Sequence, residues 1–134
     1  MQYTLNPVGI VHRRGSSNWI EIFAPYRDAL LRLEGFSHIY LLYWFHKNDT
    51  PEKRAILQVH PRKNPANPLT GVFGTHSPVR PNLIALTRCQ ILNIEKNLIY
   101  VHDIDALDGS PVIDIKCFIP DEEPLDCIRV PAWI

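Results

Sequence analysis

The sequence predicts a mainly β protein: a small antiparallel β-barrel with about one helix packed on it. Short apolar runs rich in β-branched and aromatic residues recur along the chain between turn residues, and only one stretch reads as a helix. A doubly wound α/β domain needs a helix between successive strands, and this chain has no room for them. The 134 residues are enough for one domain, which we expect to span 1–134.

The first strand is expected over residues 4–12, which are rich in apolar and β-branched side chains, with Gly9 marking a possible bulge. Residues 13–18 form a turn. Residues 19–23 alternate in a way that suits a second strand with both faces occupied.

The one helix is expected to open at Ala24 and Pro25, because proline is tolerated in a first turn, and to end at Gly35. Leucines supply its apolar side. Residues 36–46 are nearly all apolar or aromatic, and such a run predicts a strand buried on both faces.

A polar loop over 48–53 should lead into another strand over 54–60. Residues 61–70 are too rich in proline and asparagine for regular structure. Because this irregular loop runs directly into a donor-rich segment, it resembles the rim of an active site more than a linker between domains.

Two apolar runs, 83–94 and 98–102, are separated by a hairpin signal at 95–97, whose asparagine can take a left-handed turn position. The last strand is expected over 112–119. The proline-containing tail, 120–134, should wrap the surface and bury its final tryptophan and isoleucine.

Charge and cysteine content limit the classes of partner and compartment. Fourteen basic residues balance fourteen acidic ones, so any binding to RNA must come from a local patch. The three cysteines form no CxxC pair and are interpreted as reduced thiols of a cytoplasmic protein. No signal peptide and no apolar run of about 20 residues is present, so no membrane association is expected.

No metal site is predicted. The six histidines follow no HExxH or similar pattern. The aspartates at 103, 105 and 108 resemble part of a calcium-binding loop, but Asp108 stands where that loop needs glycine, so a calcium site is rejected. P-loop, kinase and nucleophile-elbow signatures are absent as well.

The segment 71–82 combines two glycines, two stiffening prolines and several hydrogen-bonding side chains between two apolar runs. The side chains that can contact a ligand there are Phe73, Thr75, His76, Ser77, Arg80 and Asn82. A rigid, donor-rich loop of this kind indicates a site for a small polar ligand with an aromatic part. The alternative is a polar corner of the barrel.

Two further segments carry charge. Arg62 and Lys63 could hold a phosphate or carboxylate, or could be solvated loop charges. The acidic segment around Asp105 and Asp108 could meet a ribose hydroxyl or a sulfonium charge, or could be a capped turn.

Four ordered motifs resemble one known family, the TsaA-like (TrmO) group. They are LEGFSHIYLLYWFH at 33–46, HPR at 60–62, GVFGTHSPVRPN at 71–82 and LDGSPVIDIK at 107–116. Members of this family are S-adenosylmethionine-dependent methyltransferases, and the characterised ones methylate N6 of threonylcarbamoyladenosine beside the tRNA anticodon. The resemblance covers most of the chain.

The resemblance implies a β-barrel methyltransferase that works as a homodimer and binds S-adenosyl-L-methionine near the barrel rim. The donor contacts that it implies are His46, Lys47, His76, Leu86, Asp105, Ala106, Leu107 and Asp108. By their place in the motif, Phe73, Thr75, Ser77, Arg80 and Asn82 would build and brace the same wall. Arg62 and Lys63, together with Arg13, Arg14 and nearby aromatic side chains, could supply a local patch that binds the RNA substrate. Asp105 and His76 are the candidates for a catalytic base.

The chain departs from the family pattern in three places. It has His76 where the family usually has arginine, a histidine being charged only part of the time at pH 7. The family's NPIG step is NLIA from Asn82 on, and the loop between the first two strands is short. Two alternatives therefore stay open: a methyltransferase with a small-molecule acceptor, and a non-catalytic module that binds S-adenosylmethionine.

Overall fold

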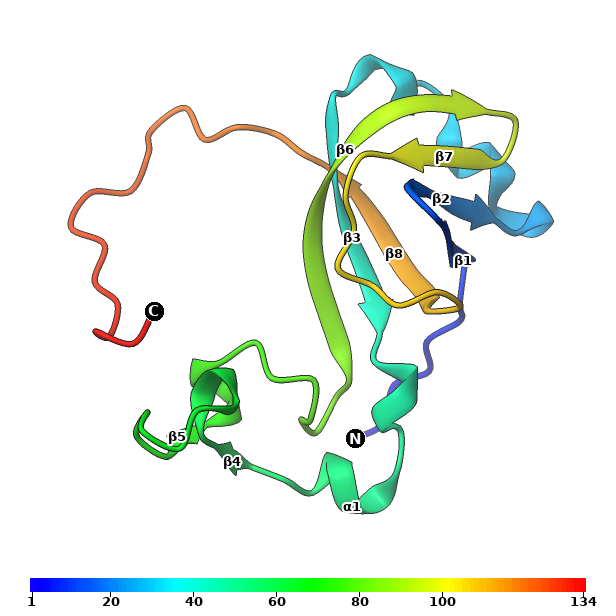
Figure 1. Ribbon diagram of the computed structural model, residues 1–134. Coiled ribbons are helices and arrows are strands. Elements are labelled where there is room, and N and C mark those ends of the chain that lie inside the picture. Colours follow the sequence, from blue (N-terminus) through cyan, green and yellow to red (C-terminus); the bar gives the residue numbers. More distant parts are fainter. The chain divides into compact units, whose positions relative to one another are not determined.

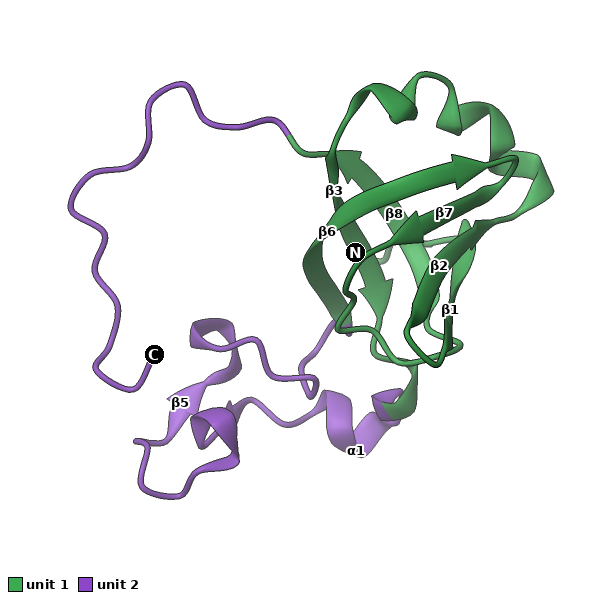
Figure 2. Ribbon diagram, turned by 45° about the horizontal axis from the view of Figure 1, so that its top comes forward, with its two compact units in different colours: residues 1–47, 84–118 green, residues 48–83, 119–134 purple.

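The structure is a computed structural model that describes all residues from 1 to 134, and strands dominate it (Figure 1). It contains two compact units (Figure 2). The first comprises residues 1–47 and 84–118, and the second comprises residues 48–83 and 119–134.

The first unit is a closed antiparallel barrel, which confirms the predicted fold class. Its strands are β1 (Gly9–Arg14), β2 (Ser17–Ile22), β3 (His38–Trp44), β6 (Ile84–Glu95), β7 (Leu98–Val101) and β8 (Pro111–Cys117). They follow one another round the barrel in the order β1-β2-β7-β6-β3-β8, and β8 pairs with β1 to close it. The core consists of side chains that point inward from alternate strand positions, among them Val11, Ile20, Ile39, Leu41, Ile99 and Val112.

The expected helix is present as two 3-10 segments, η1 (Ala24–Leu30) and η2 (Leu33–Gly35). Pro25 lies in the first turn of η1, as predicted. Arg32 has a left-handed backbone (φ 67°), which separates the two segments. Tyr26, Leu30 and Leu33 pack against the barrel core, so the segment is held by tertiary contacts and needs no long helix.

Three local expectations in the barrel are corrected. The first strand begins at Gly9, whose pairing with β2 has no bulge; a Cβ there would lie 2.3 Å from the backbone oxygen of Glu21, so close strand approach requires glycine. Strand β3 is fully buried on one face only, because its outward side chains Tyr40, Leu42 and Trp44 remain half-buried. At the β6–β7 turn the left-handed residue is Lys96.

The second unit is mostly irregular. Its elements are α1 (Pro51–Arg54), β4 (Gln58–Val59), η4 (Pro61–Lys63), β5 (Thr70–Gly71) and η5 (Val72–Gly74), while η3 (His46–Asn48) leads into it. The expected strand over 54–60 shrinks to β4, and Arg54 instead ends α1. Thr50 caps this helix by accepting from Lys53 N at 3.2 Å.

The tail follows β8 without forming a helix or strand. Its last residue, Ile134, is 60% exposed, so the expected burial of this side chain is wrong. Pro120, Pro124 and Pro131 each remove a backbone donor, which disfavours strand pairing along this segment. No helix in the structure is long and apolar enough to cross a membrane.

Candidate functional site

Strand pairing places several predicted site residues at one end of the barrel. Trp44 at the end of β3 pairs with Ile84 at the start of β6, and Tyr43 pairs with Val112 near the start of β8. The loop over 102–110 joins β7 to β8 at this same end. The predicted donor contacts in this unit are His46, Lys47, Leu86, Asp105, Ala106, Leu107 and Asp108.

The loop between β7 and β8 is anchored by alternate side chains. Ile104 and Ala106 are buried in the barrel core. Asp105, Leu107 and Asp108 are therefore directed away from the core and are exposed. The loop thus offers two carboxylates and one apolar side chain on a fixed backbone.

Arg13, at the end of β1, braces this loop from the side. Its backbone N–H donates to Asp108 Oδ1 (2.8 Å), and its guanidinium donates to the carbonyl oxygen of Ala106 (3.2 Å). Further along the loop, Ser110 Oγ donates to Leu107 O (2.7 Å). These bonds fix one oxygen of Asp108 and leave the other for a ligand.

Asn18 holds the start of the same loop and was not predicted from the sequence. Its side-chain amide donates to His102 O at 3.1 Å. The residue is 7% exposed, and its Oδ1 has no hydrogen-bond partner. The signal that could have identified it is the period-two pattern of β2, which places Asn18 on the inward face with Ile20 and Ile22.

Burial and Asp105 shift two titratable groups inside this end of the barrel. Burial raises the pKa of Cys89 from 9.0 to about 11, with the charge of Asp105 adding to the effect. Burial also raises the pKa of Tyr43 above its ordinary value, with smaller contributions from Asp105 and Cys89. The charge of Asp105 therefore contributes to both shifts, after burial.

The signature segment 71–82, in the second unit, is braced by its own polar groups. Thr75 Oγ1 donates to Val72 O (2.8 Å), and Ser77 N donates to Thr75 Oγ1 (3.1 Å). The Arg80 guanidinium donates to the carbonyls of Thr75 (3.2 Å) and Ser77 (3.3 Å). Thr75, Ser77 and Arg80 thus shape the loop and are less available to a ligand.

Three other residues of this segment face solvent. Phe73 is 86% exposed, and His76 and Asn82 are exposed as well. Buried Val72 and Leu83 anchor the two ends of the segment, and Arg54 Nε of α1 donates to the carbonyl of Pro81 at 2.9 Å. The segment therefore presents an aromatic ring, an imidazole and an amide on a fixed backbone.

Arg62 and Lys63 lie in a second braced loop of the same unit. Both are exposed and both have left-handed backbones (φ 58° and 55°), a conformation that costs free energy in residues other than glycine. His60 Nδ1 bonds to Asn67 O, and Asn67 Nδ2 donates to Pro61 O, each at 2.8 Å. These cross-links hold the two cations outward.

The predicted residues therefore form two sets, each ordered within its own unit. One set is the barrel end with the 105–108 loop, and the other is the pair of braced loops that carry 62–63 and 73–82. No group of three histidine, cysteine, aspartate or glutamate side chains is arranged to hold a metal ion.

Comparison with known proteins gives a family match over most of the chain. The family model for the tRNA-methyltransferase O N-terminal domain matches residues 6–123. A probable S-adenosyl-L-methionine-binding protein of Methanocaldococcus jannaschii is 44% identical over 128 residues, covering 96% of this chain and 99% of the relative. A mouse tRNA (adenine(37)-N6)-methyltransferase is 44% identical over 100 residues, which is 75% of this chain but 22% of the mouse protein.

The fold also matches a solved structure. The crystal structure of TrmO from Pseudomonas aeruginosa superposes with a TM-score of 0.74 at 25% sequence identity, covering 99% of this chain. This chain spans 62% of the length of that protein.

Proposed function

Because the chain belongs to the tRNA-methyltransferase O N-terminal domain family, we propose that it is an S-adenosylmethionine-dependent methyltransferase. Its proposed substrate is tRNA, at N6 of threonylcarbamoyladenosine beside the anticodon, and its place of action is the cytoplasm. The observation that carries the proposal is the family's acidic segment, 105–108, held by Arg13 at the same barrel end as His46 and Lys47.

The residues at the barrel end fit the chemistry of the donor. S-adenosylmethionine has ribose hydroxyls, a sulfonium charge and an adenine ring, so it needs acceptors, negative charge and apolar surface. Asp105 and the second oxygen of Asp108 supply the first two. Leu86 (61% exposed) and Leu107 (55% exposed) supply apolar surface for the adenine.

As the family resemblance implies, we propose that the outward side chains of the signature segment, Phe73, His76 and Asn82, are donor contacts contributed by the second unit. The match of this segment to the family motif and its internal bracing support the assignment. At position 76, where the family usually has arginine, this chain has histidine. The imidazole of His76 lacks the forked donors of a guanidinium, so it would hold a carboxylate or phosphate group less firmly.

When bound, the donor supplies an activated methyl group for in-line displacement. The chain has to align the acceptor nitrogen, exclude water and receive a proton, and alignment alone can account for several kcal/mol of the barrier. The acceptor is a urea-like N–H. Asp105 is the first candidate for the base because it lies on the fixed loop, and His76 is the second. Arg62 and Lys63, directed outward, would bind substrate phosphates.

We also propose that the protein is a homodimer. Exposed apolar side chains on the outer face of β6, Ile84 and Leu92, support an interface on this strand. Light scattering with size-exclusion chromatography measures the mass directly, and a monomer at micromolar concentration would contradict this part of the proposal.

The test of function is incubation with labelled S-adenosylmethionine and either total tRNA or a metabolite extract. Label recovered in a modified adenosine of tRNA supports the proposal. Label found only in a small metabolite would identify the alternative acceptor, and donor binding without any transfer would identify a binding module.

Single variants separate the two roles of the site. Asp105→Asn should lower the rate of transfer at saturating donor about 100-fold or more, because general-base catalysis contributes about that much. Asp103→Asn is the matched control, since the Asp103 side chain is 91% exposed on the same loop. His76→Ala should weaken donor binding without unfolding the protein, and an unchanged dissociation constant would remove His76 from the site.

A further inference from the structure

One row of side chains crosses four neighbouring strands on the outer face of the barrel. His12 of β1 pairs with Trp19 of β2, Trp19 pairs with Tyr100 of β7, and Tyr100 pairs with Asn93 of β6. All four lie outside the core, on the face opposite to the inward residues Val11, Ile20 and Ile99. Arg14 lies two residues beyond His12 on β1 and shares its outward face.

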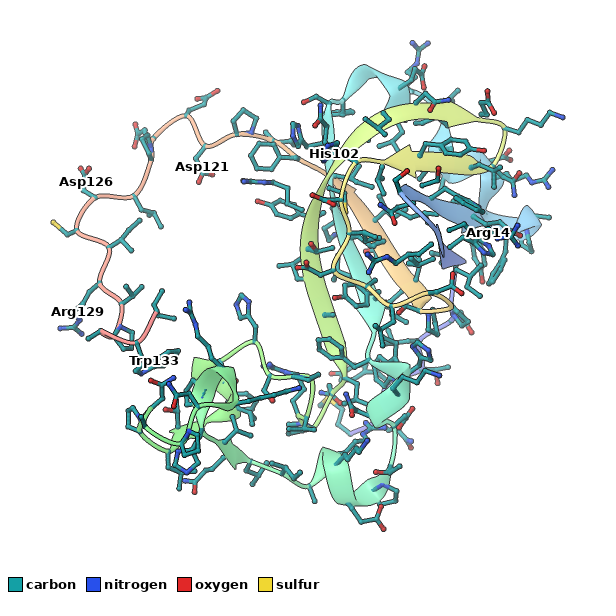
Figure 3. All side chains as sticks on the ribbon, viewed as in Figure 1. Arg14, His102, Asp121, Asp126, Arg129 and Trp133 are labelled. Atoms are coloured by element: carbon teal, nitrogen blue, oxygen red, sulfur yellow. The ribbon has the colours of Figure 1, made fainter.

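Trp19 contacts the side chains of His12, Tyr100 and Arg14. His12 and Trp19 stack with ring centroids 5.3 Å apart and an interplanar angle of 20°, and the Tyr100 ring lies 6.1 Å from Trp19. The Arg14 guanidinium lies 5.8 Å from the centre of the Trp19 ring (Figure 3 labels Arg14). We call His12, Arg14, Trp19, Tyr100 and Asn93 the aromatic row.

The charges of the row leave one cation available to a partner. Glu21 is occupied by His12, whose Nε2 lies 2.9 Å from Glu21 Oε1. Arg14 is exposed and forms no salt bridge, so its remaining N–H groups can contact an anion. Cross-strand aromatic pairs stabilise a sheet, but sheet stability alone does not require an exposed arginine beside the rings.

We propose that the aromatic row binds single-stranded RNA, with bases stacked on its partly exposed rings and Arg14 on a phosphate. Proteins recognise single-stranded RNA by stacking unpaired bases on aromatic side chains and arginine, and by hydrogen bonds from groups such as the Asn93 amide. The inference rests on the proposed function, because it names the surface that holds the loop of the tRNA substrate.

The position of the row supports this occupant. Arg14 is adjacent to Arg13, which bonds to Asp108 and Ala106 of the loop assigned to the methyl donor. RNA lying along the row toward Arg14 therefore runs toward the donor loop. The formal net charge of the chain is zero, so attraction of RNA has to be local, and the row supplies it through stacking and one cation.

The test uses Tyr100→Leu and Arg14→Gln, with Arg88→Gln as the matched control. Arg88 is also exposed, and its guanidinium lies 5.2 Å from the centre of the Phe118 ring, but on β6 it lies opposite Tyr40 of β3 and outside the aromatic row. The probes are a short fluorescein-labelled oligouridylate and total tRNA, with fluorescence anisotropy as the readout. Binding of S-adenosylmethionine by each variant, measured by calorimetry, reports whether the barrel is intact.

Tyr100→Leu should raise the dissociation constant for both RNA probes about fivefold to a hundredfold, the usual range for loss of one stacked base. Arg14→Gln should reduce the slope of log K against log salt for oligouridylate by about 0.7, the value for one phosphate contact on a single strand. Arg88→Gln should change neither, and all three variants should bind the donor like the wild type.

The proposal that the aromatic row binds RNA is refuted if Tyr100→Leu and Arg14→Gln bind RNA like the wild type, or if the wild type binds neither probe at low salt. Methyl transfer to tRNA by the wild type is measured separately. If the wild type methylates tRNA and the variants bind RNA normally, the proposed function stands but the aromatic row is not the RNA-binding surface. Weakened RNA binding by the variants, with no transfer by the wild type, would support the surface and count against the function.

Discussion

Replacing Arg13 by methionine should weaken donor binding without affecting the chemistry of the bound complex. The substitution keeps a long apolar stem on β1 but removes the guanidinium that donates to Ala106 O at 3.2 Å. The backbone N–H that donates to Asp108 remains. The loop over 105–108 therefore keeps its anchor and loses one of its braces.

The expected size of the effect follows from that one bond. Hydrogen bonds to charged groups contribute about 1.5–3 kcal/mol, and because Arg13 is exposed we discount this to about 1 kcal/mol. A free energy of about 1 kcal/mol corresponds to about a fivefold change in an equilibrium constant. If only the braced loop binds S-adenosylmethionine, the dissociation constant for S-adenosylmethionine should rise by at most about that factor.

Calorimetry with S-adenosylmethionine measures the affinity, and hydrogen exchange of the loop amides measures the bracing. Both should change by a similar factor, because they report the same equilibrium between braced and released loop. Arg14→Met is the control, since the Arg14 side chain forms no hydrogen bond with the loop. Unchanged affinity and unchanged exchange in Arg13→Met would refute the reasoning, as would an equal effect of Arg14→Met.

Three further predictions concern the frame around the site. Gly9→Ala should destabilise the barrel by about 2 kcal/mol or more, seen as a lower urea midpoint, because the added Cβ would lie 2.3 Å from the Glu21 carbonyl oxygen; a wild-type midpoint would contradict the close approach of β1 and β2. The second prediction concerns pH: the pKa of Cys89 is 9.0 in the unfolded chain and about 11 in the folded protein. Because the folded pKa is the higher one, the free energy of unfolding should fall by up to about 3 kcal/mol as pH rises from 9 to 11. Urea titrations at several pH values test this, and Cys89→Ala should reduce the slope. Arg80→Lys should make the 71–82 segment more sensitive to limited proteolysis, since an ammonium cannot reproduce the fork that reaches two carbonyls of its own loop; an unchanged cleavage rate would show that Arg80 does not brace it.

Much of the barrel could be predicted because strand signals are local. Alternation along residues 19–23 and the apolar run over 98–102 led to strands close to β2 and β7, and the acidic loop before β8 was recognised from its composition. The proline at 25 placed the helical segment correctly. Its 3-10 form depends on packing against the core and on the turn at Arg32, neither of which a local pattern reports.

The rest depends on contacts between residues far apart in the chain. Arg13 meets Ala106 and Asp108 only because β1 closes against β8. Asn18, interpreted as a turn residue, holds the loop at His102 because β2 pairs with β7, where Asn18 lies opposite Val101. The apolar run over 36–46 suggested two buried faces, but a barrel has only one interior, so the outward side chains of β3 stay half-exposed.

The closing pair, β1 with β8, also has a consequence for synthesis of the chain. Gly9 of β1 pairs with Val112 of β8. The second edge of β1, the first strand to be synthesised, therefore stays unpaired until β8 has been made. Until then β1 and β3 each expose an unpaired edge, the kind of template on which nascent chains aggregate. Contacts of such long sequence separation also slow folding. Chaperone dependence during translation should therefore end abruptly once β8 has emerged.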